Sequence, residues 1–235
     1  MGTSSRQDAI AASLAGVRHR LVRSAERSGR PFSSVRLVAI SKTRPIDDVR
    51  AAFAAGQADF GENRVQEALE KIDAAADMPI TWHLVGHLQS NKARKAAASF
   101  ACIHSIDDAE VLRRVDGAAA DIGHRPEVFV QIDLAGEPTK HGATADAWLS
   151  IFEAAATCRA VRVTGLMLLP PFTPDPEAAR PYFRRLRDLR DELAGRGVPS
   201  TMLQELSMGM SHDFEVAVEE GATVVRVGTA IFGER

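Results

Sequence analysis

The sequence predicts a single α/β domain in which eight parallel strands close into a (β/α)8 TIM-type barrel, with an additional helix at the N-terminus. Two observations predict this fold: strand-like and helix-like patterns alternate along the chain, and no Pro/Gly/Ser-rich linker interrupts the series. The 235 residues suit one such barrel, which we expect to occupy residues 1–235. An open, doubly wound sheet is the alternative, because periodicity alone does not distinguish it from a closed barrel.

The additional N-terminal helix is predicted over residues 6–28. Apolar residues between Ile10 and Val22 fall at spacings of one, three and four, which places them on one face of a helix. Gly29 and Pro31 follow and end the pattern.

The strands are short runs rich in β-branched or aromatic residues, and helical patterns separate them. The strands are predicted at residues 35–41, 58–60, 82–85, 101–104, 128–133, 161–168, 202–206 and 223–227. The helices between them are predicted near residues 45–53, 63–75, 90–99, 108–120, 144–157, 176–194 and 211–220. Strands that alternate with helices of ordinary length favour a parallel sheet.

The composition limits the classes of partner and the cellular compartment that we expect for this protein. A formal charge of −2 gives no electrostatic reason to expect a nucleic-acid partner. The first residues contain no apolar run of a signal peptide, and no stretch approaches the roughly 18 apolar residues of a membrane span. Cys102 and Cys158 lie among apolar residues and are expected to be small buried hydrophobes rather than a disulfide. We therefore expect a cytoplasmic protein without membrane contact.

Polar residues gather where the predicted strands run into the following loops, which is where the functional residues of such barrels lie. The opposite strand ends show nothing comparable, so a site for a small polar ligand is predicted at the first end. The residues at these positions are Ser41, Lys42, Gly61, Glu62, Asn63, His83, Gly86, His87, His104, Asp107, Gln131, Asp133, Met167, Ser207, Met208, Gly209, Arg226, Gly228 and Thr229.

Lys42 is the candidate nucleophile. Only five of the 29 basic residues are lysines, so the sequence uses arginine for most positive charges. A lysine at a strand end therefore indicates a role for its amine slightly more than it usually would. Imine formation needs the neutral amine, which the apolar strand before Lys42 would favour by desolvation and a nearby Arg226 by like-charge repulsion. A solvated lysine, or one that binds phosphate as a point charge, is the alternative.

A phosphate site is predicted at the last two loops. Gly228 lets the backbone approach a ligand closely, and Thr229 adds a hydroxyl at the start of a possible helical turn. Phosphate sites in these barrels commonly lie after strands seven and eight. Ser207, in the loop predicted after strand seven, is a candidate donor, whereas Ser211 is expected to cap the next helix. Ordinary turn glycines and helix caps are the alternative.

His83 and His87 suggest a metal site only weakly. They stand four residues apart across a strand end rather than on one helical face, and no nearby acid completes a familiar ligand set. Glu62 is a possible general acid or base, but a lone acid in this position is as often a helix N-terminal charge. We therefore expect no metal.

Several stretches together resemble one known family, the pyridoxal 5′-phosphate (PLP) homeostasis proteins, which are PLP-binding proteins of the alanine racemase N-terminal-like fold. They are spread in order over nearly the whole chain, and their combination is highly specific. The matching stretches are Leu37-Val-Ala-Ile-Ser-Lys-Thr43, Phe60-Gly-Glu-Asn-Arg-Val-Gln-Glu67, Trp82-His-Leu-Val-Gly-His-Leu-Gln-Ser-Asn-Lys92, Ile103-His-Ser-Ile-Asp107, Lys140-His-Gly142, Gly165-Leu-Met167, Glu205-Leu-Ser-Met-Gly-Met-Ser211 and Val225-Arg-Val-Gly-Thr-Ala-Ile-Phe-Gly233.

The resemblance implies a barrel that carries PLP as a Schiff base on Lys42 and takes part in PLP homeostasis without an established reaction. It places Ser207, Gly228 and Thr229 at the phosphate and Arg226 at the pyridine nitrogen. Asn63 lies near the ring and Met167 close to the cofactor by the same matching. Met208, next to Ser207, is expected in the same site. The loop that ends at Lys140 looks variable, which puts any role for Lys140 in doubt.

Two enzyme classes are alternatives to a PLP carrier. An amino-acid racemase would share the barrel, but it needs a second domain, and the chain ends at Arg235, directly after the eighth strand. Tyr182, the only tyrosine, lies in a helical stretch where packing is the expected role. A Schiff-base aldolase would use Lys42 on a sugar phosphate without PLP. For the carrier we expect PLP and apo PLP-dependent enzymes as partners, and a monomer.

Overall fold

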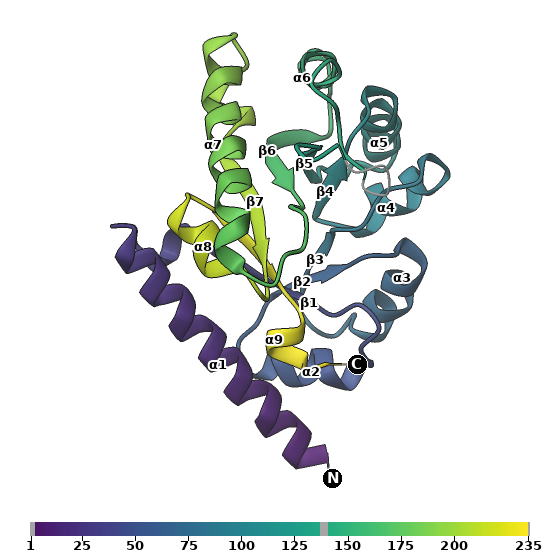
Figure 1. The fold of residues 1–235 in the computed structure, drawn as a ribbon. Helices are drawn as coiled ribbons and strands as arrows, with labels where there is room; N and C mark the ends of the chain where they lie inside the picture. Colours follow the sequence, from purple (N-terminus) through teal and green to yellow (C-terminus); the bar gives the residue numbers. More distant parts are fainter. Residues whose placement is uncertain (1–2, 137–140, 235) are drawn as a thin grey trace.

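The computed structural model describes residues 3–136 and 141–234, and in it eight parallel strands close into a barrel in the order β1-β2-β3-β4-β5-β6-β7-β8 (Figure 1). β1 pairs with β2 on one side and with β8 on the other, which closes the ring. The predicted (β/α)8 barrel is therefore confirmed over the open-sheet alternative. The strands are β1 (Arg36–Ile40), β2 (Asp59–Glu62), β3 (Thr81–Leu84), β4 (Cys102–Ile106), β5 (Glu127–Ile132), β6 (Arg162–Leu168), β7 (Glu205–Met210) and β8 (Val224–Val227).

The seventh strand lies further along the chain than predicted. Residues Ser200–Met202 form a 3-10 turn, η4, and the strand begins only at Glu205. Ser207 and Met208 therefore lie within the strand rather than in a loop after it. The Ser-Met-Gly sequence has low strand propensity, but pairing with β6 and β8 outweighs that preference.

Helices surround the barrel, and the additional N-terminal helix α1 is confirmed (Figure 1). α1 runs diagonally across α2, α8 and α9, so it covers the seam where β1 meets β8. No helix in the described part of the chain is both long and apolar enough to cross a membrane. The α-helices are α1 (Thr3–Arg27), α2 (Ile46–Ala54), α3 (Val65–Ala74), α4 (Ala93–Ser99), α5 (Ala109–Ile122), α6 (Trp148–Ala155), α7 (Arg180–Gly195), α8 (Phe214–Glu219) and α9 (Thr229–Phe232), and the remaining 3-10 turns are η1 (Phe32–Ser34), η2 (Ser90–Lys92) and η3 (Pro176–Ala179).

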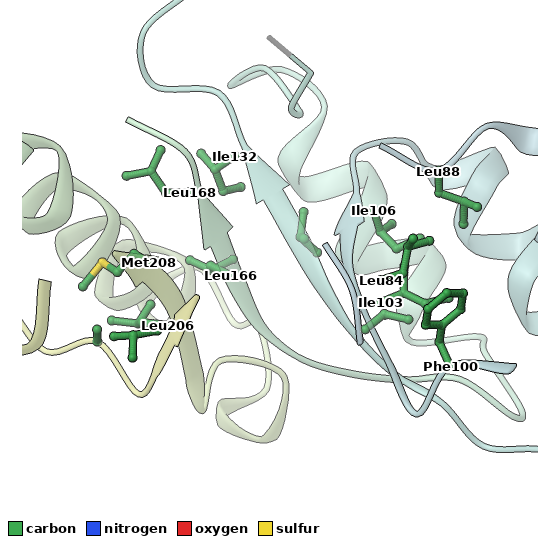
Figure 2. Close-up of a cluster of buried hydrophobic side chains, with 14 of the residues drawn as sticks. Leu84, Leu88, Phe100, Ile103, Ile106, Ile132, Leu166, Leu168, Leu206 and Met208 are labelled. Atoms are coloured by element: carbon green, nitrogen blue, oxygen red, sulfur yellow. The ribbon is translucent and has the colours of Figure 1, made fainter. Parts of the chain in front are cut away.

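The apolar core has two parts. The larger part fills the space between the strands and the surrounding helices, and Figure 2 shows some of its members, including Leu166, Leu206 and Met208. A smaller cluster contains residues of β1, β4, β5, β6 and β8, which can meet only inside the barrel. This inner cluster is formed by Val38, Cys102, Phe129, Met167 and Val224.

The two cysteines differ in burial. Cys102 is fully buried in the inner cluster, as expected, and burial raises the pKa of its thiol well above the ordinary value. Cys158 is only half-buried and packs against the outer core. Both thiols are free.

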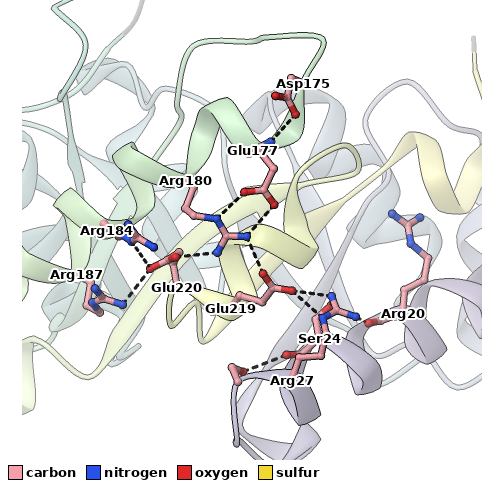
Figure 3. A network of polar contacts seen from close by, with 11 residues as sticks. Arg20, Ser24, Arg27, Asp175, Glu177, Arg180, Arg184, Arg187, Glu219 and Glu220 are labelled. Carbon is pink, nitrogen blue, oxygen red and sulfur yellow. Dashed lines mark hydrogen bonds and ion pairs between the residues drawn. The ribbon is translucent and has the colours of Figure 1, made fainter.

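An ion-pair network joins α1, α7 and α8 on the outside of the barrel (Figure 3). The guanidinium of Arg180 lies 2.6 Å from Glu177, 2.7 Å from Glu219 and 2.8 Å from Glu220, and Arg27 pairs with Glu219 at 2.7 Å. Burial by itself raises the pKa of Glu219 and Glu220, but the hydrogen bonds from arginines outweigh it, so both pKa values lie below the ordinary range. The network therefore stabilises the fold only while these carboxylates are ionised.

We expect the contribution of this network to stability to depend on pH. A carboxylate with a lowered pKa in the folded state adds stability above its unfolded pKa, about 4.3, and loses it as pH falls through the folded pKa. Arg180→Met should therefore lower the free energy of unfolding at pH 7 and lower it less at pH 3. Urea titrations of both proteins at the two pH values measure this, and an equal difference at both would contradict it.

Candidate functional site

A cavity of about 370 Å³, which we call the upper cavity, opens at the C-terminal ends of the strands. Five of the eight predicted site residues line it, from strand ends that are far apart in sequence: Lys42, Asn63, Arg226, Gly228 and Thr229. The remaining wall is mostly apolar, with two further polar side chains near the last strands. These other lining residues are Ile40, Val85, Leu169, Phe172, Met210, Ser211 and His212.

A second cavity, of about 450 Å³, lies at the opposite end of the barrel, where the strands begin, and we call it the lower cavity. The expectation that this end carries no comparable set of polar residues is therefore wrong. The polar residues are spread over the starts of several strands, and only closure of the barrel brings them together. Its lining residues are Arg36, Asp59, Thr81, His83, Ala101, Cys102, His124, Arg125, Glu127 and Arg162.

Lys42 follows β1 and lines the upper cavity at a tightly constrained turn. The next residue, Thr43, has φ of 62° in the left-handed region, which is unfavourable for a β-branched residue by about 1–3 kcal/mol. The Thr43 N–H donates to a carboxylate oxygen of Glu67 on α3, which holds the turn in this conformation. The direction in which Lys42 leaves the strand is thus set by a helix that follows the neighbouring strand.

A buried lysine, Lys71 of α3, supports the same turn. Its ammonium lies 2.6 Å from the carbonyl oxygen of Ser41 and 2.7 Å from Glu62, and the Ser41 hydroxyl donates to Glu62 at 2.7 Å. Burial raises the pKa of Glu62, although the hydrogen bonds from Lys71 and Ser41 oppose this. Glu62 does not line the cavity; it bonds to Lys71 of α3 and to Ser41, next to the turn that carries Lys42.

Sequence reasoning missed Lys71. The Glu67–Lys71 spacing of four residues on a helix after the second strand was the available signal, since such a pair lies on one helical face. The pattern does not reveal that this face turns inward, and an ordinary surface ion pair has the same spacing.

Arg226 is almost fully buried and lines the upper cavity. Its guanidinium donates to the Ser207 hydroxyl at 2.5 Å and to the carbonyl oxygen of Leu168 at 2.8 Å. Burial lowers the pKa of Arg226 to about 10, and the nearby carboxylate of Asp213 partly opposes this. The side chain therefore stays cationic at neutral pH.

Ser211, rather than Ser207, lies beside Gly228 and Thr229. The Ser211 hydroxyl accepts hydrogen bonds from the N–H groups of Gly228 at 3.0 Å and Ala230 at 3.3 Å. It does not cap α8, which begins later, at Phe214. A Cβ atom at Gly228 would lie 3.2 Å from the carbonyl oxygen of Ile40, so glycine permits the close approach of this turn to β1.

The other three predicted site residues lie outside the upper cavity. Ser207 is fully buried inside the barrel between His104 and Arg226, and Met167 belongs to the inner apolar cluster. The side chain of Met208 points the other way, into the outer core, as Figure 2 shows. Successive residues of a strand face opposite sides of the sheet, so Ser207 and Met208 cannot both face inward, and the expected contact of the Met208 side chain with a ligand is corrected.

The structure separates the two histidines that suggested a metal site. His83 lies inside the barrel with Cys102 and His104, and its ring nitrogens are both within hydrogen-bond distance of protein partners. His87 lies near Asp107, and its ring stacks on that of His141 with centroids 3.6 Å apart and an angle of 9°. The expectation that no acid lies near these histidines is wrong, because His87, Asp107 and His141 offer ligand atoms within 4.8 Å of one another. Lys140 lies outside the described residues.

Residues 12–235 match the family model described as the N-terminal domain of alanine racemase. The pyridoxal phosphate homeostasis protein of Aquifex aeolicus is 41% identical over 94% of this chain and 96% of its own length. The structure of PipY from Synechococcus elongatus with PLP bound superposes with a TM-score of 0.84 at 40% identity and covers 95% of this chain and 100% of PipY.

An alanine racemase from Clostridium difficile is similar in fold alone. It superposes with a TM-score of 0.73 at 13% identity, over 97% of this chain and 57% of the racemase. The homeostasis protein of Aquifex aeolicus and PipY, by contrast, are 41% and 40% identical to this chain over nearly the full length of both partners. The chain belongs to the alanine racemase N-terminal domain family and, within it, to the pyridoxal phosphate homeostasis proteins.

Proposed function

We propose that this protein binds PLP in the upper cavity, holds it as a Schiff base on Lys42 and takes part in intracellular PLP homeostasis. The observation that carries the proposal is the arrangement of this cavity. A lysine amine, a buried arginine and the last turn, with the hydroxyls of Ser211 and Thr229, line one space of about 370 Å³. The PLP bound to PipY and the name of the Aquifex aeolicus relative support the same reading.

The residues present fit this cofactor. The volume falls within the range of small-molecule sites, and the wall combines apolar side chains with a few polar ones, as such sites do. PLP supplies an aldehyde that a lysine amine can capture and a ring that can withdraw electrons. Gly228 lines this space without a side chain, and its turn packs closely against Ile40 of β1.

Each residue has a proposed task. Lys42 binds the aldehyde carbon, and Ser211, Gly228 and Thr229 hold the phosphate at the last turn. Arg226 donates to the ring nitrogen, and Asn63 flanks the ring. Ser211 here replaces Ser207, because only Ser211 lines the cavity.

Arg226 also favours binding over turnover. A guanidinium at the ring nitrogen disfavours protonation of that nitrogen and so weakens the ring as an electron sink. Tyr182, the only tyrosine, packs against the outer core and does not line the cavity. The relatives are named as homeostasis proteins rather than as enzymes. We propose that the protein carries PLP without catalysing a reaction.

The visible absorption spectrum of the purified protein tests this proposal, before and after PLP and then borohydride are added. We expect an imine band that borohydride removes, with PLP left on a peptide that contains Lys42. A protein that shows no band with excess PLP would contradict the proposal and favour a phosphate-binding barrel with another substrate.

Thr229→Val should weaken PLP binding and leave the fold unchanged. Loss of a hydrogen bond to a charged phosphate costs about 1.5 kcal/mol, which corresponds to roughly tenfold in the dissociation constant. Titration of the cofactor-free protein with PLP measures the change. Thr157→Val is the matched control, because that hydroxyl bonds to Ala154 at a helix end on the outside of the barrel. Equal affinities of wild type and T229V would remove Thr229 from the phosphate site.

We also propose that the protein acts in the cytoplasm as a monomer and passes PLP to apo PLP-dependent enzymes. The names of its relatives state a role in PLP homeostasis, and this role supports the transfer of PLP. Light scattering after size exclusion tests the monomer, and reactivation of an apo enzyme by the loaded protein tests the transfer. Reactivation no faster than with an equal amount of free PLP would contradict direct delivery.

A further inference from the structure

A chain of hydrogen bonds crosses the inside of the barrel from the lower cavity to the upper one. His83 Nε2 lies 3.0 Å from Asp59 Oδ1, and His83 Nδ1 lies 2.9 Å from His104 Nε2. His104 Nδ1 lies 2.8 Å from the Ser207 hydroxyl, to which Arg226 donates at 2.5 Å. The five residues come from β2, β3, β4, β7 and β8, so the chain spans the barrel from one side to the other.

This chain of hydrogen bonds is buried except at Asp59, its lower end. His83, His104 and Ser207 are fully buried, and Arg226 is 4% exposed. The side chain of Asp59 is 26% exposed and lines the lower cavity. The inner apolar cluster surrounds the middle, where the ring of Phe129 lies 4.5 Å from that of His104. Buried polar groups in such surroundings are costly unless each has its partner, so an unbroken chain is expected to be rigid.

The chemistry of the two ends sets the direction of the first and last hydrogen bonds, and the protons on the two rings set the others. The Asp59 carboxylate only accepts, and the guanidinium of Arg226 only donates. Burial lowers the pKa of His104 well below the ordinary value, so this ring carries one proton. If His83 also carries a single proton, it donates from Nε2 to Asp59, and His104 donates from Nε2 to His83. Ser207 then donates to His104 and accepts from Arg226, so that all donors point from Arg226 towards Asp59.

We propose that Asp59, His83, His104 and Ser207 are positioning residues for Arg226, which they hold in place at the cofactor cavity. The proposal rests on the proposed PLP site. Arg226 has one other hydrogen-bond acceptor among the described residues, the carbonyl oxygen of Leu168. The chain adds a second acceptor and links the cation, through aligned dipoles, to the anion of Asp59 at the far end of the barrel. A change in charge at the lower cavity should therefore alter the interaction of Arg226 with the ring of the cofactor.

The nearest link is tested by Ser207→Ala. This variant removes the hydroxyl that both Arg226 and His104 use, and we expect PLP binding to weaken about fivefold, the effect of one net hydrogen bond. The imine absorption maximum should shift as well. The matched control is Thr164→Val, because the Thr164 hydroxyl is buried on β6 without a hydrogen-bond partner in the described structure. An S207A protein with wild-type affinity and spectrum would overturn the proposal.

The far end is tested by Asp59→Asn, which removes a charge from the lower cavity and leaves the cofactor cavity untouched. We expect an altered imine spectrum and a loss of PLP affinity of about threefold. Glu127→Gln is the control. Glu127 lines the same lower cavity and carries the same charge, but it takes no part in the chain of hydrogen bonds. Equal effects of D59N and E127Q would show a general electrostatic influence and would overturn the proposed coupling.

Long-range proton–nitrogen NMR spectra of the cofactor-free protein test the chain without PLP. We expect His83 and His104 both to carry their proton on Nε2, with the Nδ1 resonance of His104 displaced in S207A. A proton on Nδ1 of either ring would overturn the arrangement. If the wild type takes up no PLP, the proposed function fails while these spectra still decide whether the chain exists. If it takes up PLP but the variants match it, only the present inference fails.

Discussion

Lys42→Ala should give a folded protein that carries no PLP after borohydride treatment. Among the described residues, Lys42 is the lysine that lines the upper cavity, and without its amine we expect no imine there. Residual PLP would be held only through the phosphate turn and Arg226, and it would leave on dialysis. The imine band and the mass of the Lys42 peptide after reduction are the two measurements.

The control for this variant is Lys95→Ala, which removes an exposed lysine from α4. It should keep both the imine band and the modified Lys42 peptide. Borohydride-stable PLP retained by K42A at the wild-type level would show that another lysine forms the imine, and the assignment of Lys42 would be wrong.

Lys71→Met should have the largest effect on stability. It leaves the carboxylate of Glu62, whose side chain is fully buried, without its cation at 2.7 Å. Removal of one partner of a buried ion pair costs about 3–5 kcal/mol in the free energy of unfolding. The variant also removes the hydrogen bond to the Ser41 carbonyl, so PLP should form the imine more slowly on the protein that remains folded.

The pH dependence of this loss has a defined sign. Burial already raises the pKa of Glu62, and without Lys71 it rises further. A carboxyl with a raised folded pKa destabilises the fold increasingly as pH climbs above the unfolded pKa of about 4.3. The difference between wild type and K71M should therefore be larger at pH 7 than at pH 5 in urea titrations.

The double variant Lys71→Met with Glu62→Gln identifies the cause. Neutral glutamine in place of the unpaired carboxylate should recover part of the lost stability, because the buried charge is then gone. Lys95→Met, on the surface of α4, should change stability by less than about 0.5 kcal/mol. A double variant that is no more stable than K71M would show that lost packing, rather than the buried charge, explains the effect.

The sequence by itself was sufficient for the order of the barrel and for several residues that line its upper cavity. Strand and helix patterns are local, and eight repeats in a chain of this length predicted the closed barrel that the structure confirms. Lys42, Arg226, Gly228 and Thr229 stand at strand ends, and strand ends of a parallel barrel meet at one mouth. Their meeting in one cavity thus followed from the topology.

Only the tertiary structure decided which neighbouring side chains support that site. Which face of β7 turns inward depends on where the strand begins, and this separates Ser207 from Met208 and brings Ser211 to the last turn. Lys71 is buried because α3 packs on the turn after β1, although its spacing from Glu67 is that of a surface pair.

The buried chain from Asp59 to Arg226 depends even more on the closed barrel. Its members lie up to 167 positions apart in sequence. The neighbouring sequence of each one does not distinguish it from an ordinary polar residue in a strand. Local patterns determine strands and helices, because those arise from neighbours along the chain. Hydrogen bonds across the inside of a barrel arise only when it closes. The sequence therefore determined which strand-end residues line the upper cavity, and the tertiary structure determined what holds them in place.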